Sequence, residues 1–77
     1  MRFHFDVKPT SDAADAVLSS QLAQELAVLD FDSPKQMMDT ITDTLKAHAP
    51  HMRVGQHNGI TNVHGRAGIV MRVRSMC

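Results

Sequence analysis

The sequence predicts a single α+β domain over residues 1–77, with a mainly antiparallel four-stranded sheet and two helices packed on one face. Three observations support this two-layer fold. The first residues alternate between apolar and polar, the middle of the chain has apolar residues at helical spacing, and turn signals divide the last third into short strands. The order β-α-α-β-β-β leaves two-layer packing as the simplest way to bury every apolar face.

The first strand is predicted at residues 2–7, where apolar and polar side chains alternate. Successive side chains of a strand point to opposite faces, so this pattern is typical of a strand with one face buried. The buried face would hold Phe3, Phe5 and Val7, and the other face Arg2, His4 and Asp6.

The first helix is predicted from residue 12 to about residue 29, because leucines recur there at the spacing of one helix face. The hydroxyl of Thr10 or Ser11 is expected to cap it, and Asp12 and Asp15 to lie favourably near the positive end of its dipole. The predicted apolar stripe comprises Leu18, Leu22, Leu26 and Leu29, widened by Ala14, Val17 and Ala23.

The second helix is predicted to begin at Ser33, which precedes a proline at the first helical position and Gln36 at the third. It should end near Ala49, because Pro50 disfavours helical geometry in the residue before it. The predicted stripe is Met37, Met38, Ile41 and Leu45. Methionine adapts to varied contacts, so Met37 with Ile41 is either part of the core or the edge of a partner site.

A hairpin is predicted over residues 51–64, because Asn58-Gly59 readily supplies the two positive φ angles of a type I′ turn. This turn sets the register, with residue 57 facing 60, 54 facing 63 and 53 facing 64. A further turn at 65–68 leads to a fourth strand at 69–75. The helix-facing side would hold Val54, Val63, Ile69, Met71 and Val73, and the outward side Arg53, His57, Ile60, His64, Val70, Arg72 and Arg74.

The formal net charge of zero conceals an uneven distribution. Residues 11–49 carry seven acidic and two basic side chains, a net charge of −5, whereas the flanking segments carry six basic and one acidic, a net charge of +5. The predicted strand alternation gathers the basic residues on the sheet face opposite the helices. The candidate binding residues there are Arg2, Arg53, His57, His64, Arg72 and Arg74, together with His4.

A basic face of this kind attracts polyanions, and arginine matches carboxylate and phosphate geometry. The sequence favours a small protein-binding regulator or inhibitor that occludes a larger, oppositely charged partner. Proteins of this size that act against host defence or transcription are often encoded by phages and other mobile elements. The alternative is a nucleic-acid-binding protein using the same face, although all three phenylalanines are assigned to the core and leave no stacking ring. Exposed arginines that serve only solubility are a third interpretation.

No catalytic, metal or cofactor motif stands out, so neither an enzyme activity nor a bound cofactor is expected. Four histidines lie between positions 48 and 64, but the hairpin register places His57 and His64 near opposite ends of one ladder, which argues against a shared metal. The arrangement best suited to catalysis is Arg53 beside His64, a pair that could act on a phosphodiester.

The cellular setting predicted is the cytoplasm. No apolar run approaches the roughly 20 residues of a membrane span, and the first residues lack the features of a secretion signal. The single Cys77 excludes an intrachain disulfide and suits a reducing compartment. A core of this size is marginal, so a homodimer formed through an edge strand is a further possibility.

Overall fold

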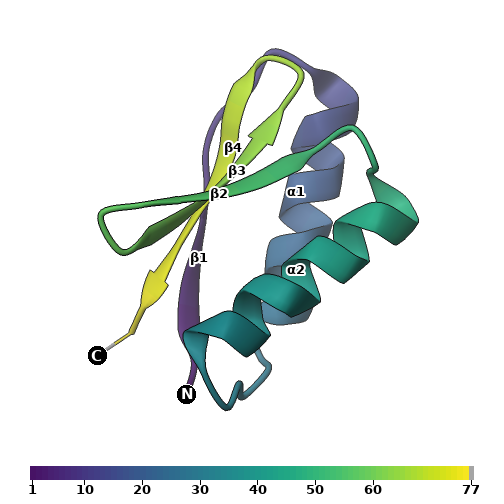
Figure 1. The fold of residues 1–77 in the computed structure, drawn as a ribbon. Coiled ribbons are helices and arrows are strands. Elements are labelled where there is room, and N and C mark those ends of the chain that lie inside the picture. The colour runs from purple at the N-terminus through teal and green to yellow at the C-terminus, as the bar shows by residue number, and fades with distance from the viewer. Residues whose placement is uncertain (77) are drawn as a thin grey trace.

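A computed structural model describes residues 1–76, and in that range it contains two helices and four strands in the predicted order (Figure 1). The elements are β1 (Phe3–Val7), α1 (Ala13–Leu26), α2 (Pro34–His48), β2 (Arg53–His57), β3 (Ile60–Gly65) and β4 (Gly68–Ser75). The sheet is antiparallel throughout, with the strand order β1-β4-β3-β2. The first strand therefore lies beside the last. Residue 77 is not described, so the predictions made for Cys77 lie outside the described residues.

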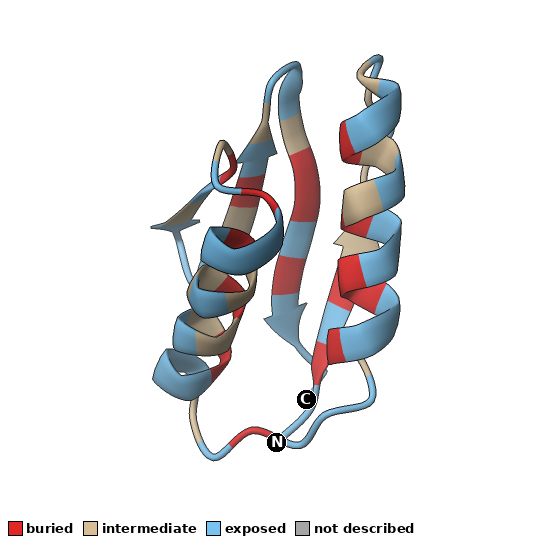
Figure 2. Cartoon of the chain, turned by 90° about the vertical axis from the view of Figure 1, so that its right-hand side faces the viewer, coloured by how far each residue is buried: buried red, intermediate tan, exposed pale blue. Residues whose placement is uncertain are grey.

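Both helices cover the same face of the sheet, as predicted (Figure 2). Helix α1 packs on β1 and β4, whereas α2 packs on β2. The buried apolar residues form one cluster between the layers: Phe3, Phe5, Leu22, Ala23, Leu26, Phe31, Met37, Ile41, Leu45, Ala49, Met52, Val63, Val70, Met71 and Val73. We call the sheet face that the helices leave uncovered the outer face.

The hairpin between β2 and β3 has the register that Asn58-Gly59 predicts. Residue 57 pairs with 60, 54 with 63 and 53 with 64. Both turn residues have positive φ angles, 52° at Asn58 and 78° at Gly59, as a type I′ turn requires.

The sheet faces predicted for Ile69 and Val70, at the start of β4, are wrong. Val63 pairs with Met71 but His64 pairs with Ile69, so Val70 is the extra residue of a β-bulge. Val70 is fully buried, whereas Ile69 is only half-buried and shares the outer face with His64. The bulge reverses the faces that strict alternation assigned to Ile69 and Val70.

Helix α1 also departs from the predicted stripe. It ends at Leu26, which leaves Leu29 40% exposed, and Val17 is 57% exposed. The first two turns instead bury polar residues, Asp15 and Ser19. Asp15 is buried because its carboxylate makes hydrogen bonds with distant segments.

The helix ends follow ordinary capping chemistry. Asp12, rather than Thr10 or Ser11, caps α1, because its side chain accepts a 3.0 Å hydrogen bond from the Asp15 amide. Ser33 caps α2 as predicted, accepting from the Gln36 amide at 3.1 Å. The Gln36 side chain in turn accepts a hydrogen bond from the Asp32 amide. The residues before α2 and those in its first turn thus stabilise each other.

Two further core assignments change, at Val7 and Met52, and the alternative left open for Met37 and Ile41 is decided. Val7 lies at the end of an edge strand, where it has a strand neighbour on one side only, and is partly exposed. Met37 and Ile41 are buried in the core, so they do not form the edge of a partner site. Met52, which no periodic pattern marked, is buried between α2 and β2.

Within residues 1–76, neither helix has the length and apolar character that crossing a membrane requires.

Candidate functional site

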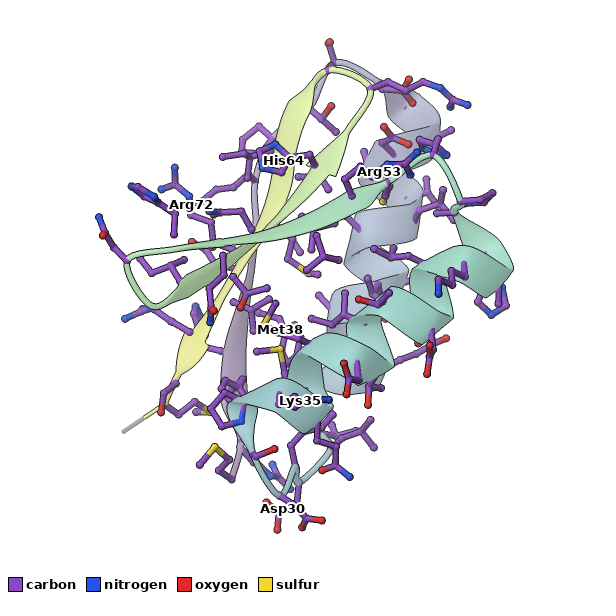
Figure 3. The ribbon with its side chains drawn as sticks, in the orientation of Figure 1. Asp30, Lys35, Met38, Arg53, His64 and Arg72 are labelled. Carbon is purple, nitrogen blue, oxygen red and sulfur yellow. The ribbon has the colours of Figure 1, made fainter. Side chains whose placement is uncertain are left out.

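The outer face is built by side chains that alternate with the buried ones along all four strands. Cross-strand pairing places Arg74 of β4 opposite His4 of β1, and Arg72 between Asp6 and Asn62. Figure 3 shows Arg72 and His64 on the side of the sheet away from the helices. By register the outer face comprises His4, Asp6, Arg53, Gly55, His57, Ile60, Asn62, His64, Ile69, Arg72 and Arg74.

The arginines at the centre of this face lie beside one carboxylate but form no ion pair with it. Asp6 is the single carboxylate among the outer-face residues of the described strands, and its Oδ2 lies 2.7 Å from Lys8 Nζ. The hydrogen bond with Lys8 lowers the pKa of Asp6 below its ordinary value, and the charge of Arg74 adds to this lowering. Within residues 1–76, Arg72 and Arg74 make no ion pair with a carboxylate.

Two further features lie beside these arginines. The Oδ1 atom of Asn62, opposite Arg72, is buried and has no hydrogen-bond partner among the described residues. Buried acceptors of this kind are uncommon in folded proteins and are usually satisfied by a bound molecule or water. A shallow hollow of about 220 Å³ lies next to Arg74 and is lined by His4, Arg74, Ser75 and Met76.

Two of the predicted site residues lie apart from this centre. The guanidinium of Arg53 turns back along the chain, where Nη1 donates to the carbonyl oxygens of Pro50 at 2.7 Å and Met52 at 3.1 Å. Arg2 precedes β1 and contributes, after the N-terminal amine, to the lowered pKa of Asp30. Both residues are exposed, and neither pairs across the sheet with Arg72 or Arg74.

The two histidines of the hairpin do not converge on one another. His57 pairs with Ile60 beside the hairpin turn, and His64 pairs with Arg53 at the other end of the same ladder, as the register predicts. Across residues 1–76, no three side chains of the metal-binding types lie close enough to hold an ion.

A second polar cluster, which the sequence did not indicate, lies at the N-terminal end of α1. The side chain of Asp15 is completely buried. Its Oδ1 lies 2.6 Å from His51 Nε2, and its Oδ2 accepts a 2.7 Å hydrogen bond from the Arg66 amide. One carboxylate thus joins the start of α1 to the α2–β2 connection and to the β3–β4 turn. His51 is half-buried against it.

The chemistry of this cluster is that of a structural anchor. The hydrogen bond from the Arg66 amide, and then that with His51, lower the pKa of Asp15, so the carboxylate stays charged. Both of its oxygens are occupied by partners within the chain. Gly65 leaves the necessary room, because a Cβ there would lie 2.4 Å from Asp15 Oδ2. The partners are 36 and 51 residues away in sequence, so no local pattern could have revealed them.

Comparison with known proteins yields no relative for this chain: no family model, no curated protein and no solved structure matches it. Inferences about its function therefore rest on the residues and geometry described above.

Proposed function

We propose that the chain is a small protein-binding regulator or inhibitor whose outer face docks on an acidic surface of a larger protein. The observation that carries this proposal is the pair Arg72 and Arg74, which lies on an uncovered sheet face without a carboxylate partner in residues 1–76. An exposed arginine pair on a rigid strand favours carboxylates and steers association. Binding there would block the partner surface sterically.

The neighbouring groups support a protein partner over a nucleic acid. Ile60 and Ile69 add apolar contact area on the same face. Nucleic-acid-binding sheets commonly stack bases on exposed aromatic rings. Here Phe3, Phe5 and Phe31 are all buried in the core. We further propose that the protein acts in the cytoplasm and belongs to the class of small proteins carried by phages or other mobile elements.

The test is affinity capture from a lysate of cells that naturally contain the protein, followed by mass spectrometry. We expect an acidic protein that is retained after nuclease treatment and lost with Arg72→Glu/Arg74→Glu. Lys35→Glu is the control for charge reversal away from the outer face: it changes half as much charge, on α2, where Lys35 pairs with Asp39.

Two results would overturn the proposal. Retention of the same partner by the doubly substituted protein would remove the outer face from binding. Loss of all captured protein after nuclease treatment, together with a mobility shift of DNA or RNA at low salt, would establish the nucleic-acid alternative instead.

A further inference from the structure

A second surface lies at the edge of the sheet, away from the centre of the outer face. A hollow of about 310 Å³ opens between the C-terminal half of α2 and strand β2. Its base is apolar, since Leu45 and Met52 are 5% and 4% exposed and belong to the core. The lining is Thr42, Leu45, Lys46, Pro50, Met52, Arg53 and Val54.

Strand β2 forms the border of this hollow and, among the described strands, pairs with β3 alone. In a two-residue hairpin the residues that flank the turn exchange backbone hydrogen bonds, and every second residue after them does the same. The residues between them, Val54 and Gln56, therefore direct their backbone N–H and C=O groups toward the free edge. The Val54 side chain points to the helix side, so a strand added along β2 would direct alternate side chains into the hollow.

The opposite edge of the sheet is less open to strand addition. Beside the start of β1, the Phe31 amide donates a 2.7 Å hydrogen bond to the Met1 carbonyl oxygen. The connection between α1 and α2 thus covers part of that edge. Proteins commonly protect sheet edges in this way, and an edge left uncovered is a template for another strand.

The charge around the hollow indicates what would bind there. Lys46 and Arg53 are exposed at its rim, and none of the seven lining residues is acidic. The hydrogen bonds to Pro50 and Met52 hold the Arg53 guanidinium in place while its other N–H groups stay available. A second copy of the chain would bring another β2 strand, which contains Arg53 and His57 but no carboxylate. An acidic segment complements this rim and a second copy does not.

We propose that β2 and the adjoining hollow bind an extended acidic segment of a partner protein. The segment would add to the sheet as a fifth strand through the backbone groups of Val54 and Gln56. One aliphatic side chain would enter the hollow, and a neighbouring carboxylate would contact Lys46 and Arg53. This site shares Arg53 with the border of the outer face but does not use Arg72 or Arg74, so it can be tested separately from them.

The probe is a heptapeptide that alternates glutamate with valine and leucine, titrated into the full chain and followed by amide NMR. We expect shifts centred on β2 and the end of α2, and slower hydrogen exchange at the Val54 and Gln56 amides. Gln56→Pro, which removes one free-edge N–H, and Lys46→Glu should each weaken binding by about tenfold or more. Lys35→Glu and Arg72→Glu/Arg74→Glu should leave this affinity unchanged.

Each other outcome would contradict the proposal. Absence of shifts at β2 up to about 1 mM peptide would exclude the site. If a peptide with lysine in place of glutamate bound with the same affinity, the basic rim would have no role in binding. Concentration-dependent shifts of β2 without peptide would assign the edge to a second copy. Loss of peptide binding in Arg72→Glu/Arg74→Glu would show that the peptide binds the outer face instead of the hollow.

Discussion

Two groups of charged side chains in this molecule differ in where their partners lie. The carboxylate of Asp15 is buried, and both of its oxygens are bound by residues of the same chain. The guanidinium groups of Arg72 and Arg74 lie on an uncovered face, without a carboxylate partner in residues 1–76. The difference separates two roles, because a charge satisfied within the fold stabilises it, whereas an unsatisfied exposed charge is available to another molecule.

The largest effect on stability is expected at Gly65, which accommodates the buried carboxylate. In Gly65→Ala the added Cβ would lie 2.4 Å from Asp15 Oδ2 and 2.9 Å from Val70 Cγ1. Neither neighbour can move freely, so the free energy of unfolding should fall by about 2–3 kcal/mol. Urea unfolding measures this change. Gly55→Ala is the matched control and should change stability little, because nothing lies within 4 Å of a Cβ there.

A smaller loss is expected when the charge of the anchor is removed. Asp15→Asn keeps the shape of the side chain but weakens the hydrogen bonds from Arg66 and His51. We expect the melting temperature to fall by about 5–10 °C. Asp43→Asn, on the exposed surface of α2, serves as the control in thermal unfolding. Equal melting temperatures for the two variants would show that Asp15 is not an anchor.

The anchor also predicts a dependence of stability on pH. The pKa of Asp15 is lower in the folded chain than its ordinary value of about 4, so folding favours the charged form. Its contribution is therefore complete well above pH 4 and is lost as the pH falls through the lowered, folded pKa. Unfolding measured from pH 7 to pH 2 should show a shallower acid loss in Asp15→Asn than in the natural chain. The pKa values of Asp6 and Asp30 are also lowered, and their contributions remain in both proteins.

Features encoded by neighbouring residues could be predicted from the sequence. The hairpin register follows from Asn58-Gly59, and the start of α2 follows from Ser33 and Pro34. The bulge at Val70 could not be predicted, because three consecutive apolar residues fit either face until β3 is paired beside them. The outer face was predicted in position, since alternation alone places Arg72 and Arg74 there.

The burial of Asp15 shows the limit of pattern reading. An aspartate in the first turn of a helix is ordinarily explained by the helix dipole, and that explanation accounts fully for its presence. Only the folded chain brings the Arg66 amide and His51 to it. Arg53 is a similar case. Alternation predicts on which face of the sheet its backbone position lies, but it does not predict that its guanidinium donates hydrogen bonds to the carbonyl oxygens of Pro50 and Met52.

The most direct test of the contrast between the two groups combines stability and binding in one neutral variant, Arg72→Ser/Arg74→Ser. We predict a free energy of unfolding within about 0.5 kcal/mol of the natural chain, because neither arginine has a carboxylate partner to lose in residues 1–76. Affinity for the captured partner, measured by titration calorimetry, should fall by about tenfold or more. A variant that loses as much stability as Asp15→Asn yet binds the partner normally would contradict the account.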